Sequence, residues 1–411
     1  MTCRGVAAAR RGDAMRALNV LDDGAILIGD DGRIDAVGRY RDVRASAGAA
    51  TTVETSGVIF PGFIDCHTHA VFGAARLADH ERRALGMDYK TIAAGGGGIL
   101  SSVRDLHMWS VDDLRDVTAR RLNHLLAQGT TTVEVKSGYG LDTAVELRQL
   151  DVIASLEMGG LPAVVPTFLG AHEVPTDYRA RREAYVALVL DEMLPKVAEH
   201  GVARFCDVFC EPGVFTVAES RAILQRAAGL GLGLKVHADE LDGSGGAELA
   251  VELGAVSADH LARVSDAGVA ALARGRTVAV LLPGTMLFLG RSDRAPARRL
   301  IEAGAAVALA TDFNPGSSPG MSLPLMATLG VSQLGMTPAE AVHAITTNAA
   351  AAVGEAATRG QIAVGYRADL VEVAIREWRE LVYWYGVNLV RQVWVGGLAC
   401  HPREGPVNFV V

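Results

Sequence analysis

The sequence predicts an α/β protein built on a (β/α)8 TIM-type barrel, with a small β-sandwich domain built from both chain termini. Eight short apolar runs are each followed by a polar loop and a segment of helical periodicity, which is typical of repeated strand–helix units. Residues able to do chemistry follow nearly all eight runs. Short strands with turn signals occupy both ends of the chain. We expect the β domain to comprise residues 1–60 plus 360–411, and the barrel residues 61–359.

The composition is that of a globular protein. The 411 residues suffice for one large and one small domain, at about 100 to 200 residues per domain. Hydrophobic residues make up 50% and charged residues 21%, which supports a sizeable core and argues against disorder. The net charge, 39 − 47 = −8, and the lack of a basic tract argue against a nucleic-acid partner.

The cysteines and the apolar runs bear on location. The five cysteines are odd in number and widely spaced, which argues against a disulfide framework or a thiolate zinc site. Residues 1–13 lack the apolar segment of a signal peptide, and no stretch of about 18 apolar residues occurs. We therefore expect a cytoplasmic protein without a membrane partner.

The two ends of the chain are predicted to pair with each other. Asp22-Asp23-Gly24 and Asp30-Asp31-Gly32 flank the apolar run 25–29 and indicate hairpin turns. Because neither end has enough strands for a stable sheet, we expect both to share one domain. The strands expected near the C-terminus are 365–373, 389–395 and 407–411.

The barrel is predicted from alternating strands and helices. The candidate strands are 59–65, 130–135, 163–168, 205–209, 232–237, 258–260, 277–282 and 306–310. The candidate helices are 112–128, 143–158, 181–199, 217–228 with Gly229 as the stop, 245–253, 264–273, 295–303 and 338–352. The last helix has Thr337 as N-cap, Pro338 at its first position and Glu340 to complete a capping box.

An open, doubly wound sheet is the structural alternative to the barrel. The polar residues at the carboxyl ends of the strands favour the barrel, because in a barrel all these ends converge on one opening.

The first barrel strand ends in a His-x-His pair. In an extended chain residues i and i+2 face the same side, so His67 and His69 can share one cation. A chance pair that only hydrogen-bonds locally is the alternative. Single chemically capable residues follow strands five, six and eight, namely His237, His260 and Asp312. Together they favour a metal site in which His67, His69, His237 and Asp312 bind a borderline divalent ion such as zinc, with one coordination position open for water.

At these residues the chain resembles the amidohydrolase superfamily, and within it the branch that opens the imidazolone ring in histidine degradation. The resemblance covers nearly the whole chain. The stretches that carry it are DCHTHAVFG (65–73), GGGGI (95–99), TTVEVKSGYGLD (131–142), TFLGAHEVP (167–175), DVFCE (207–211), VHADEL (236–241), SADHL (257–261), VLLPGT (280–285) and ATDFNPGSSP (310–319). Ala74, Pro212 and Phe313 depart from the family pattern, and none is a proposed ligand.

The resemblance implies one zinc or iron ion per chain, a homodimer, and a small-molecule substrate, 4-imidazolone-5-propanoate, which is hydrolysed to N-formimidoyl-L-glutamate. Arg76 suits the propionate as a bidentate partner, with a solvated loop arginine as the alternative. Tyr139 and His172 follow strands two and three and could bind the polar atoms of the ring. The substrate-binding residues expected are Arg76, Tyr139, His172, Glu240, Asn314, Gly316 and Ser317.

Catalysis is expected to need an activated water and proton transfers. The metal would lower the pKa of that water toward about 7. We expect His260 and Asp312 to handle its proton and Glu240 to contact the ring nitrogens, although the sequence leaves the three roles open. Lys136 follows strand two and not strand four, so a bridging carboxylated lysine and a second metal are disfavoured.

Two other functions stay open at this stage. Another cyclic-amide hydrolase or an aminohydrolase of the same superfamily would share the metal ligands but not Arg76, Tyr139 and His172 together. A noncatalytic relative would usually have lost ligands, and here all four are present.

Overall fold

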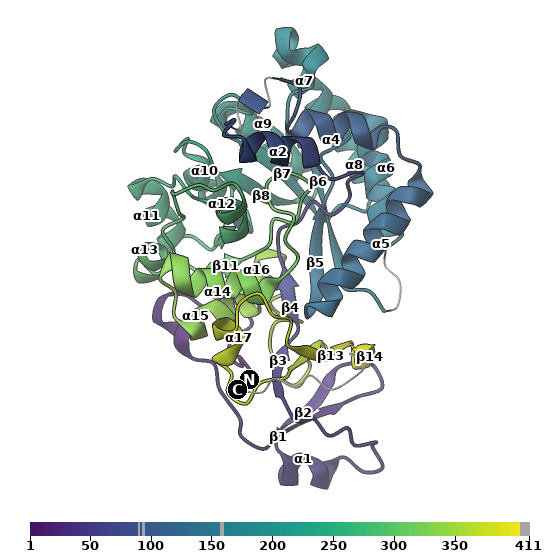
Figure 1. Ribbon diagram of the computed structural model, residues 1–411, viewed down its shortest axis with the longest axis vertical. Coiled ribbons are helices and arrows are strands. Elements are labelled where there is room, and N and C mark those ends of the chain that lie inside the picture. Colours follow the sequence, from purple (N-terminus) through teal and green to yellow (C-terminus); the bar gives the residue numbers. More distant parts are fainter. Residues whose placement is uncertain (89–90, 93–94, 157–159, 403–411) are drawn as a thin grey trace.

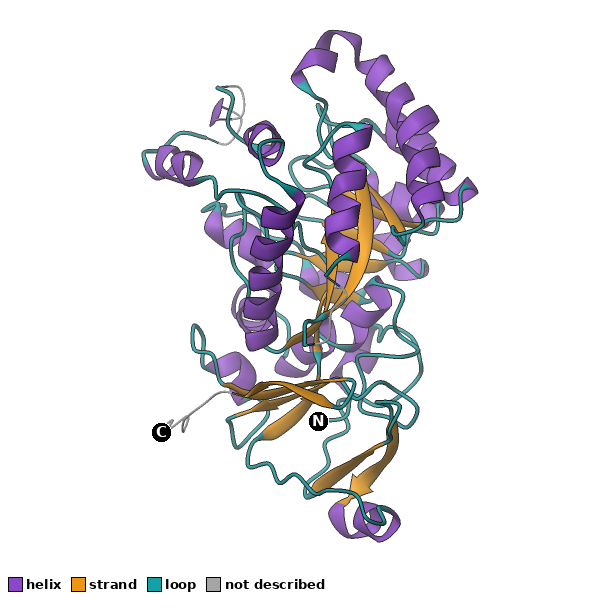
Figure 2. Ribbon diagram, turned by 90° about the vertical axis from the view of Figure 1, so that its right-hand side faces the viewer, coloured by secondary structure: helices purple, strands orange, loops and turns teal. Residues whose placement is uncertain are grey.

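The computed structural model describes residues 1–88, 91–92, 95–156 and 160–402. Its larger part is an eight-stranded parallel sheet curled into a barrel and flanked by helices, with smaller antiparallel sheets at one end (Figure 1). Figure 2 shows the four-stranded sheet lying across that end of the barrel, with a two-stranded ribbon beside it. The predicted fold class is therefore confirmed.

The barrel strands follow one another in the sheet in the order in which they occur along the chain. They are β4 (Phe63–Asp65), β5 (Thr130–Lys136), β6 (Ala163–Ala171), β7 (Phe205–Cys210), β8 (Gly233–Ala238), β9 (Ser257–His260), β10 (Val278–Leu281) and β11 (Val307–Leu309). The barrel nearly closes just beyond β4 and β11, where the His69 N–H donates to Phe313 O at 2.9 Å and the Asp312 N–H donates to His67 O at 3.1 Å. This closure rules out the open sheet, and it is made by residues of the predicted site.

Helices connect and surround the barrel strands. Those that occur before β8 are α2 (Leu77–Ala84), α4 (Ile99–Leu106), α5 (Val111–Ala127), α6 (Thr143–Ala154), α7 (Arg182–Leu188), α8 (Leu194–His200) and α9 (Val217–Gly229). The later ones are α10 (Gly246–Glu252), α11 (Asp266–Arg274), α12 (Pro283–Phe288), α13 (Ala297–Glu302), α14 (Leu323–Leu334), α15 (Pro338–Ala344), α16 (Thr347–Ala352) and α17 (Glu380–Tyr383).

Several predicted helices differ in detail. The capping box of Thr337 and Glu340 is confirmed, but the helix ends at Ala344 and α16 begins at Thr347. The predicted helix 181–199 is divided by a π-helical turn, Val189–Met193, between α7 and α8. Gly229 is the last residue of α9 and not the stop after it. The predicted end of helix 143–158 and the strand 407–411 lie outside the described residues.

The predicted strand 59–65 serves two sheets. Its first half is β3 (Val58–Pro61), in the four-stranded sheet, and its second half is β4. The chain changes sheets at Gly62, where a Cβ atom would lie 2.1 Å from Thr131 Oγ1, so only glycine lets the backbone pass so close to β5. One apolar run thus joins the small sheet directly to the first barrel strand.

The two ends of the chain meet in the four-stranded sheet, whose order is β14-β13-β12-β3. β3 pairs antiparallel with β12 (Leu370–Val373), which is followed by β13 (Val390–Val395) and β14 (Leu398–Pro402). The predicted hairpin, β1 (Gly24–Ile28) and β2 (Ile34–Arg39) with α1 (Tyr40–Ser46) after it, forms a separate sheet. It contacts the C-terminal segment through the isolated bridge between Arg33 and Arg367 and the backbone hydrogen bonds around it. Ile34 also packs in one apolar cluster with Ala368 and Leu370. The boundaries of the two domains stay a prediction.

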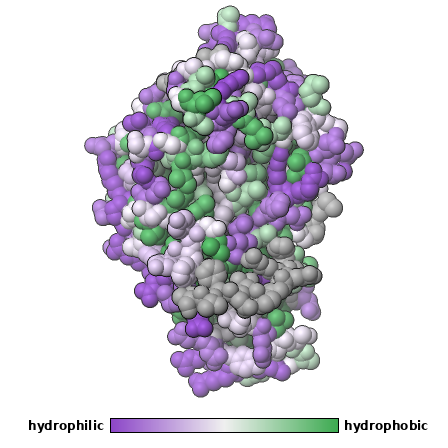
Figure 3. Space-filling model, viewed as in Figure 1, coloured by the Kyte–Doolittle hydropathy of each residue, from purple (hydrophilic) through white to green (hydrophobic). Residues whose placement is uncertain are grey.

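The surface is mixed in character. Hydrophilic side chains line most of the outline in Figure 3, with smaller groups of apolar side chains between them. Within the described ranges, no helix combines the length and apolar character needed to cross a bilayer.

Candidate active site

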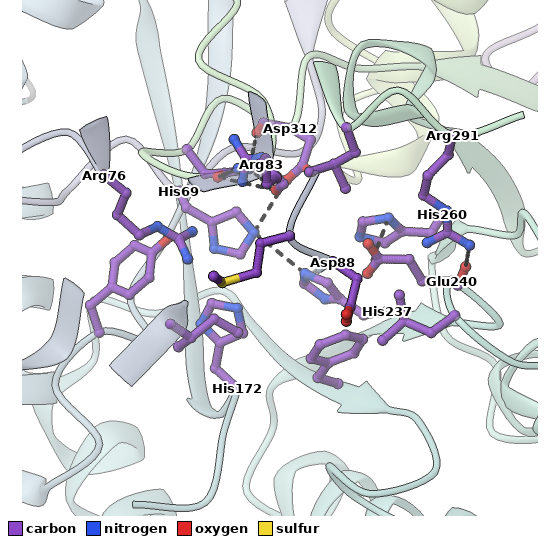
Figure 4. Close-up of a pocket in the computed structure, with 18 of the residues that line it drawn as sticks. His69, Arg76, Arg83, Asp88, His172, His237, Glu240, His260, Arg291 and Asp312 are labelled. Carbon is purple, nitrogen blue, oxygen red and sulfur yellow. Dashed lines mark hydrogen bonds and ion pairs between the residues drawn. The ribbon is translucent and has the colours of Figure 1, made fainter. Parts of the chain in front are cut away.

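A cavity of about 330 Å³ opens at the carboxyl ends of the barrel strands (Figure 4). Side chains from strands, loops and the α2 region converge on it. Its lining residues are His69, Arg76, Arg83, Gly86, Met87, Asp88, Ile99, Tyr139, His172, Phe209, His237, Glu240, Leu241, His260, Leu289, Arg291, Asp312, Asn314 and Ser317. Most of the residues predicted for the site thus line one cavity.

The predicted metal ligands lie at the centre of the site. His67, His69 and His237 each offer a ring nitrogen within 4.8 Å of the others. Asp312 Oδ1 lies 3.6 Å from His67 Nε2 and 3.5 Å from His69 Nε2. His69 Nε2 and His237 Nε2 are 3.4 Å apart. His67, His260 and Asp312 form a second group of the same compactness.

Buried carboxylates orient the histidines. His67 Nδ1 lies 2.6 Å from Asp259 Oδ2, and His237 Nδ1 lies 3.0 Å from Asp207 Oδ2. A carboxylate at Nδ1 favours a proton there, which leaves Nε2 free as an electron-pair donor. Asp207 and Asp259 were not among the predicted site residues, although they lie in the stretches DVFCE and SADHL. Two sequence signals could have identified them: Asp207 lies on the strand before that of His237, and Asp259 directly precedes His260.

A buried lysine lies below the ligands. Lys136 Nζ is 2.6 Å from Glu134 Oε1 and 2.7 Å from Asp207 Oδ2. Burial alone would lower the pKa of Lys136, but Asp207 and Glu134 outweigh it and raise the pKa above its usual range. The lysine is therefore a charged ion-pair partner of Glu134 and Asp207.

The donor set fits one divalent cation. His67 Nε2, which lies near Asp312 Oδ1, is buried without a hydrogen-bond partner, which is costly unless another group uses it. Burial, together with Lys136 and the neighbouring imidazoles, lowers the pKa of His67 and His69 well below the usual value, so both rings are neutral, as ligands must be. Three imidazoles and a carboxylate are typical of zinc and similar ions.

Glu240 and His260 lie on the far side of the ligands from Arg76 (Figure 4). Glu240 Oε2 is 3.5 Å from His260 Nδ1. Burial, the carboxylate of Asp312 and that of Glu211 raise the pKa of Glu240 to about 8. Burial also raises the pKa of Asp312 to about 6, although Thr285 donates a hydrogen bond to its Oδ2 at 2.7 Å.

Backbone strain marks two of these residues. His260 has φ +77° and Asp312 has φ +52°, a region that non-glycine residues seldom occupy. Such conformations cost on the order of 1 to 3 kcal/mol each and gather at functional sites. Here they turn the chain sharply at the end of β9 and just beyond β11.

Arg76, Tyr139 and His172 lie together on the other side of the cavity. His172 stacks on His69 with 5.0 Å between ring centroids, and the Tyr139 ring lies 5.4 Å from that of His172. His172 Nδ1 lies 2.9 Å from Gly138 O. Since a carbonyl can only accept, this nitrogen carries the proton and Nε2 is the acceptor. Burial, followed by His237, lowers the pKa of His172 to about 3, so the ring is neutral.

The loop after β11 shapes this side of the cavity. Asn314 Oδ1 accepts from the Gly316 and Ser317 N–H groups at 2.8 Å each, and its amide donates to Asp312 O at 2.6 Å. The Asn314 side chain therefore forms its hydrogen bonds within the loop. Asn314 and Ser317 also line the cavity. At Gly316 a Cβ atom would fall 1.9 Å from Arg76 Cζ, so the glycine makes room for the guanidinium. Arg76 Nε is buried without a partner.

Four charged or flexible residues that line the cavity were not predicted from the sequence, namely Arg83, Met87, Asp88 and Arg291. Arg83 lies two helical turns after Arg76, and its Nη2 donates to Gly316 O at 2.9 Å. This seven-residue spacing is a helical signal, but helix α2 was not predicted. Arg291 lies beside Glu240, donating to its carbonyl at 3.4 Å, and pairs with Asp293.

Solved structures with the same fold bind and act on various compounds. The E. coli guanine deaminase superposes with a TM-score of 0.73 at 15% identity, covering 97% of this chain and 100% of that chain. An adenosine deaminase from Xanthomonas campestris with bound zinc has a TM-score of 0.71 at 20% identity, covering 95% and 91%. At such low identity these likenesses show the fold alone.

Sequence comparison is more specific. Residues 58–399 match the amidohydrolase family. The imidazolonepropionase of Symbiobacterium thermophilum is 50% identical over 389 residues, which cover 93% of this chain and 91% of the relative. That of Solibacter usitatus is 45% identical over 406 residues, covering 98% and 97%. The chain therefore belongs to the amidohydrolase family and, within it, to the imidazolonepropionases.

Proposed function

We propose that the protein hydrolyses the ring amide of 4-imidazolone-5-propanoate to N-formimidoyl-L-glutamate in histidine degradation. In this reaction water adds to the ring carbonyl, the ring C–N bond breaks, and the leaving nitrogen takes up a proton. One observation carries the proposal: a single cavity holds a half-buried arginine, Arg76, on one side and the His/His/His/Asp cluster at its centre. Relatives named for this activity share 40% to 50% of the sequence over nearly the full length.

His67, His69, His237 and Asp312 would hold one zinc or iron ion per chain. When bound, the ion supplies Lewis acidity that activates water and polarises the ring carbonyl. The carboxylates of Asp207 and Asp259 keep the imidazoles aimed at that centre.

His260, Asp312 and Glu240 would move the protons. Asp312 and His260 lie at the ligand cluster, where they can accept the proton that the attacking water loses. Glu240 has a pKa of about 8, so it holds a proton at neutral pH and can donate it to a ring nitrogen. A raised pKa in a buried carboxyl group is typical of a general acid.

Arg76 would read the propionate. Its guanidinium lies over Gly316, with Nε unused by the protein. Tyr139 and His172 would bind the ring, His172 through the acceptor Nε2. Asn314, Gly316 and Ser317 would contribute by shaping the loop around Arg76, since the Asn314 side chain is bonded within that loop.

We include a homodimer and a cytoplasmic location in the proposal. The family resemblance supports the dimer, and five cysteines without disulfides agree with a reducing compartment.

The alternative is another cyclic-amide hydrolase or an aminohydrolase. The two deaminases with the same fold are the reason to test this alternative. The test follows the ultraviolet absorbance of imidazolone propionate after addition of metal-loaded protein. We expect its absorbance to fall and N-formimidoyl-L-glutamate to form. Guanine and adenosine serve as competing substrates, and turnover of either one in place of the imidazolone would contradict the proposal.

A further inference from the structure

Glu211 is a buried carboxylate that holds the loop carrying Glu240. It follows β7 directly, and none of its surface is exposed. Its Oε2 accepts the N–H of Glu240 at 3.1 Å, and its Oε1 accepts those of Leu241 and Asp242 at 3.2 and 2.5 Å. Three successive backbone N–H groups of the loop after β8 thus donate to one side chain just beyond the neighbouring strand, β7.

Glu146 does the same for the loop that carries Tyr139. It lies on α6, is fully buried, and accepts the N–H groups of Gly138, Gly140 and Leu141 at 3.1, 2.8 and 2.9 Å. The N–H that it skips, that of Tyr139, donates to Gln149 Oε1 at 3.1 Å, one turn further along the helix. The whole 138–141 loop is therefore fastened to α6.

Burying the carboxylates of Glu211 and Glu146 costs free energy. Among the residues that the structure describes, neither has an ion-pair partner. Loop N–H groups offset the burial of Glu211, and the Ser137 hydroxyl together with loop N–H groups offsets that of Glu146. Burial raises the pKa of Glu211 to about 7 and raises that of Glu146 as well. A buried carboxylate without a cation is unfavourable for folding compared with an apolar side chain. The N–H groups that each carboxylate accepts offset part of this cost.

Both loops also hold a strained residue. Asp239, just before Glu240, has φ +52°, and Leu141, two residues after Tyr139, has φ +56°. Non-glycine residues stay in this left-handed region only where surrounding contacts impose it. The carboxylates of Glu211 and Glu146 provide such contacts, because they bond to Glu240 N and to Leu141 N respectively.

We propose that Glu211 and Glu146 are positioning residues for the reaction, each acting through one side chain of the cavity: Glu211 sets the place of Glu240 and Glu146 that of Tyr139. The inference rests on the proposed function. It assigns the two residues different kinetic effects, because Glu240 serves proton transfer and Tyr139 serves ring binding.

The first experiment is a double-mutant cycle on the full-length, metal-loaded protein. Glu211→Ala should lower kcat by about 100-fold, the order of loss expected when a catalytic group moves by about 1 Å. If Glu211 acts only through Glu240, the double variant Glu211→Ala/Glu240→Ala should have the kcat of Glu240→Ala alone. Effects that multiply would overturn the proposal. Glu211→Gln should recover part of the loss, since its amide keeps one acceptor oxygen.

The second cycle pairs Glu146→Ala with Tyr139→Phe and should show its effect mainly in KM. Glu340→Gln is the matched control, because Glu340 is equally buried and bonds to Thr337, Arg16 and Arg298, none of which lines the cavity. That variant should lose stability while keeping kcat and KM. If Glu211→Ala and Glu146→Ala behave like this control, both residues are only structural and the proposal is wrong.

A readout that needs no turnover completes the test. Amide hydrogen exchange at residues 240–242 should speed up in Glu211→Ala, and exchange at 138–141 should speed up in Glu146→Ala, each without the other. Unchanged exchange in both would overturn the proposal. Failure of the proposed function is distinguishable, because then the wild-type protein would also leave the imidazolone unchanged.

Discussion

The floor and the rim of the cavity are held by different means. We call the ligands His67, His69, His237 and Asp312 the floor, and Arg76, Tyr139, His172 and Glu240 the rim. Floor side chains are fixed by other side chains, such as Asp259 on His67 and Thr285 on Asp312. The rim residues Tyr139 and Glu240 lie on loops whose backbone N–H groups are held by Glu146 and Glu211.

This difference separates two properties of the site. Side-chain contacts and the hydrogen bonds that close the barrel set the floor, so a change there should affect metal binding. Loop conformation sets the rim, so a change there should alter turnover or substrate affinity while the metal stays bound. The following predictions test that separation, from the largest effect to the smallest.

Removing a floor ligand should abolish activity. His67→Ala, His237→Ala and Asp312→Ala each leave too few donors to hold the ion and activate water. Elemental analysis should find about one metal per wild-type chain and almost none in these variants. Two metals per wild-type chain, or a variant that keeps its metal and turns over, would show that the floor is assigned wrongly.

Removing the proposed acid on the rim should lower kcat and spare the metal. Glu240→Ala should reduce kcat by about 10²- to 10⁴-fold, the usual contribution of a general acid or base. Glu240→Gln should be milder, because the amide keeps one acceptor and adds donors. Metal content and kcat should be measured for each variant and for the wild-type protein. An unchanged kcat would mean that Glu240 takes no part in the mechanism.

Truncating Arg76 should weaken binding of the propionate. Arg76→Ala should cost about 2 to 5 kcal/mol, mostly as a raised KM, because the tail is remote from the bond that breaks. Arg76→Lys should rescue only part, as it keeps the charge and loses the planar fork. The control is an imidazolone without the carboxylate. If Arg76→Ala still prefers the full substrate as strongly as wild type, another group reads the tail.

Weakening the support of the floor should have the smallest effect. Asp259→Asn keeps the shape of the side chain but loses the charge that faces His67 Nδ1. We expect metal affinity to fall by about 10- to 100-fold, as for other partners that orient a ligand. Competition with a chelator measures this, and kcat of the fully loaded variant should fall much less. Undiminished affinity would mean that strand packing alone orients His67.

The fold was largely predictable because its signals are local. All eight barrel strands were predicted, since apolar runs and helical periods repeat along the chain. The boundaries that were predicted wrongly depend on contacts with segments that are distant along the chain. Residues 59–65 read as one strand, yet Gly62 lets the chain leave the small sheet and join the barrel beside Thr131. The break between α15 and α16 likewise falls in a segment whose helical pattern is continuous.

By itself the sequence determined the elements, the strand ends and the residue types that meet there, because these follow from periodicity and spacing along the chain. Only the tertiary structure decided which buried charges face which ligands. Asp207 lies 30 residues from His237, and Asp259 lies 192 residues from His67. The same holds for Glu211 and Glu146, whose bonds run to backbone N–H groups. Every residue but proline has such a group, so no pattern of side chains marks which of them a distant carboxylate will bind.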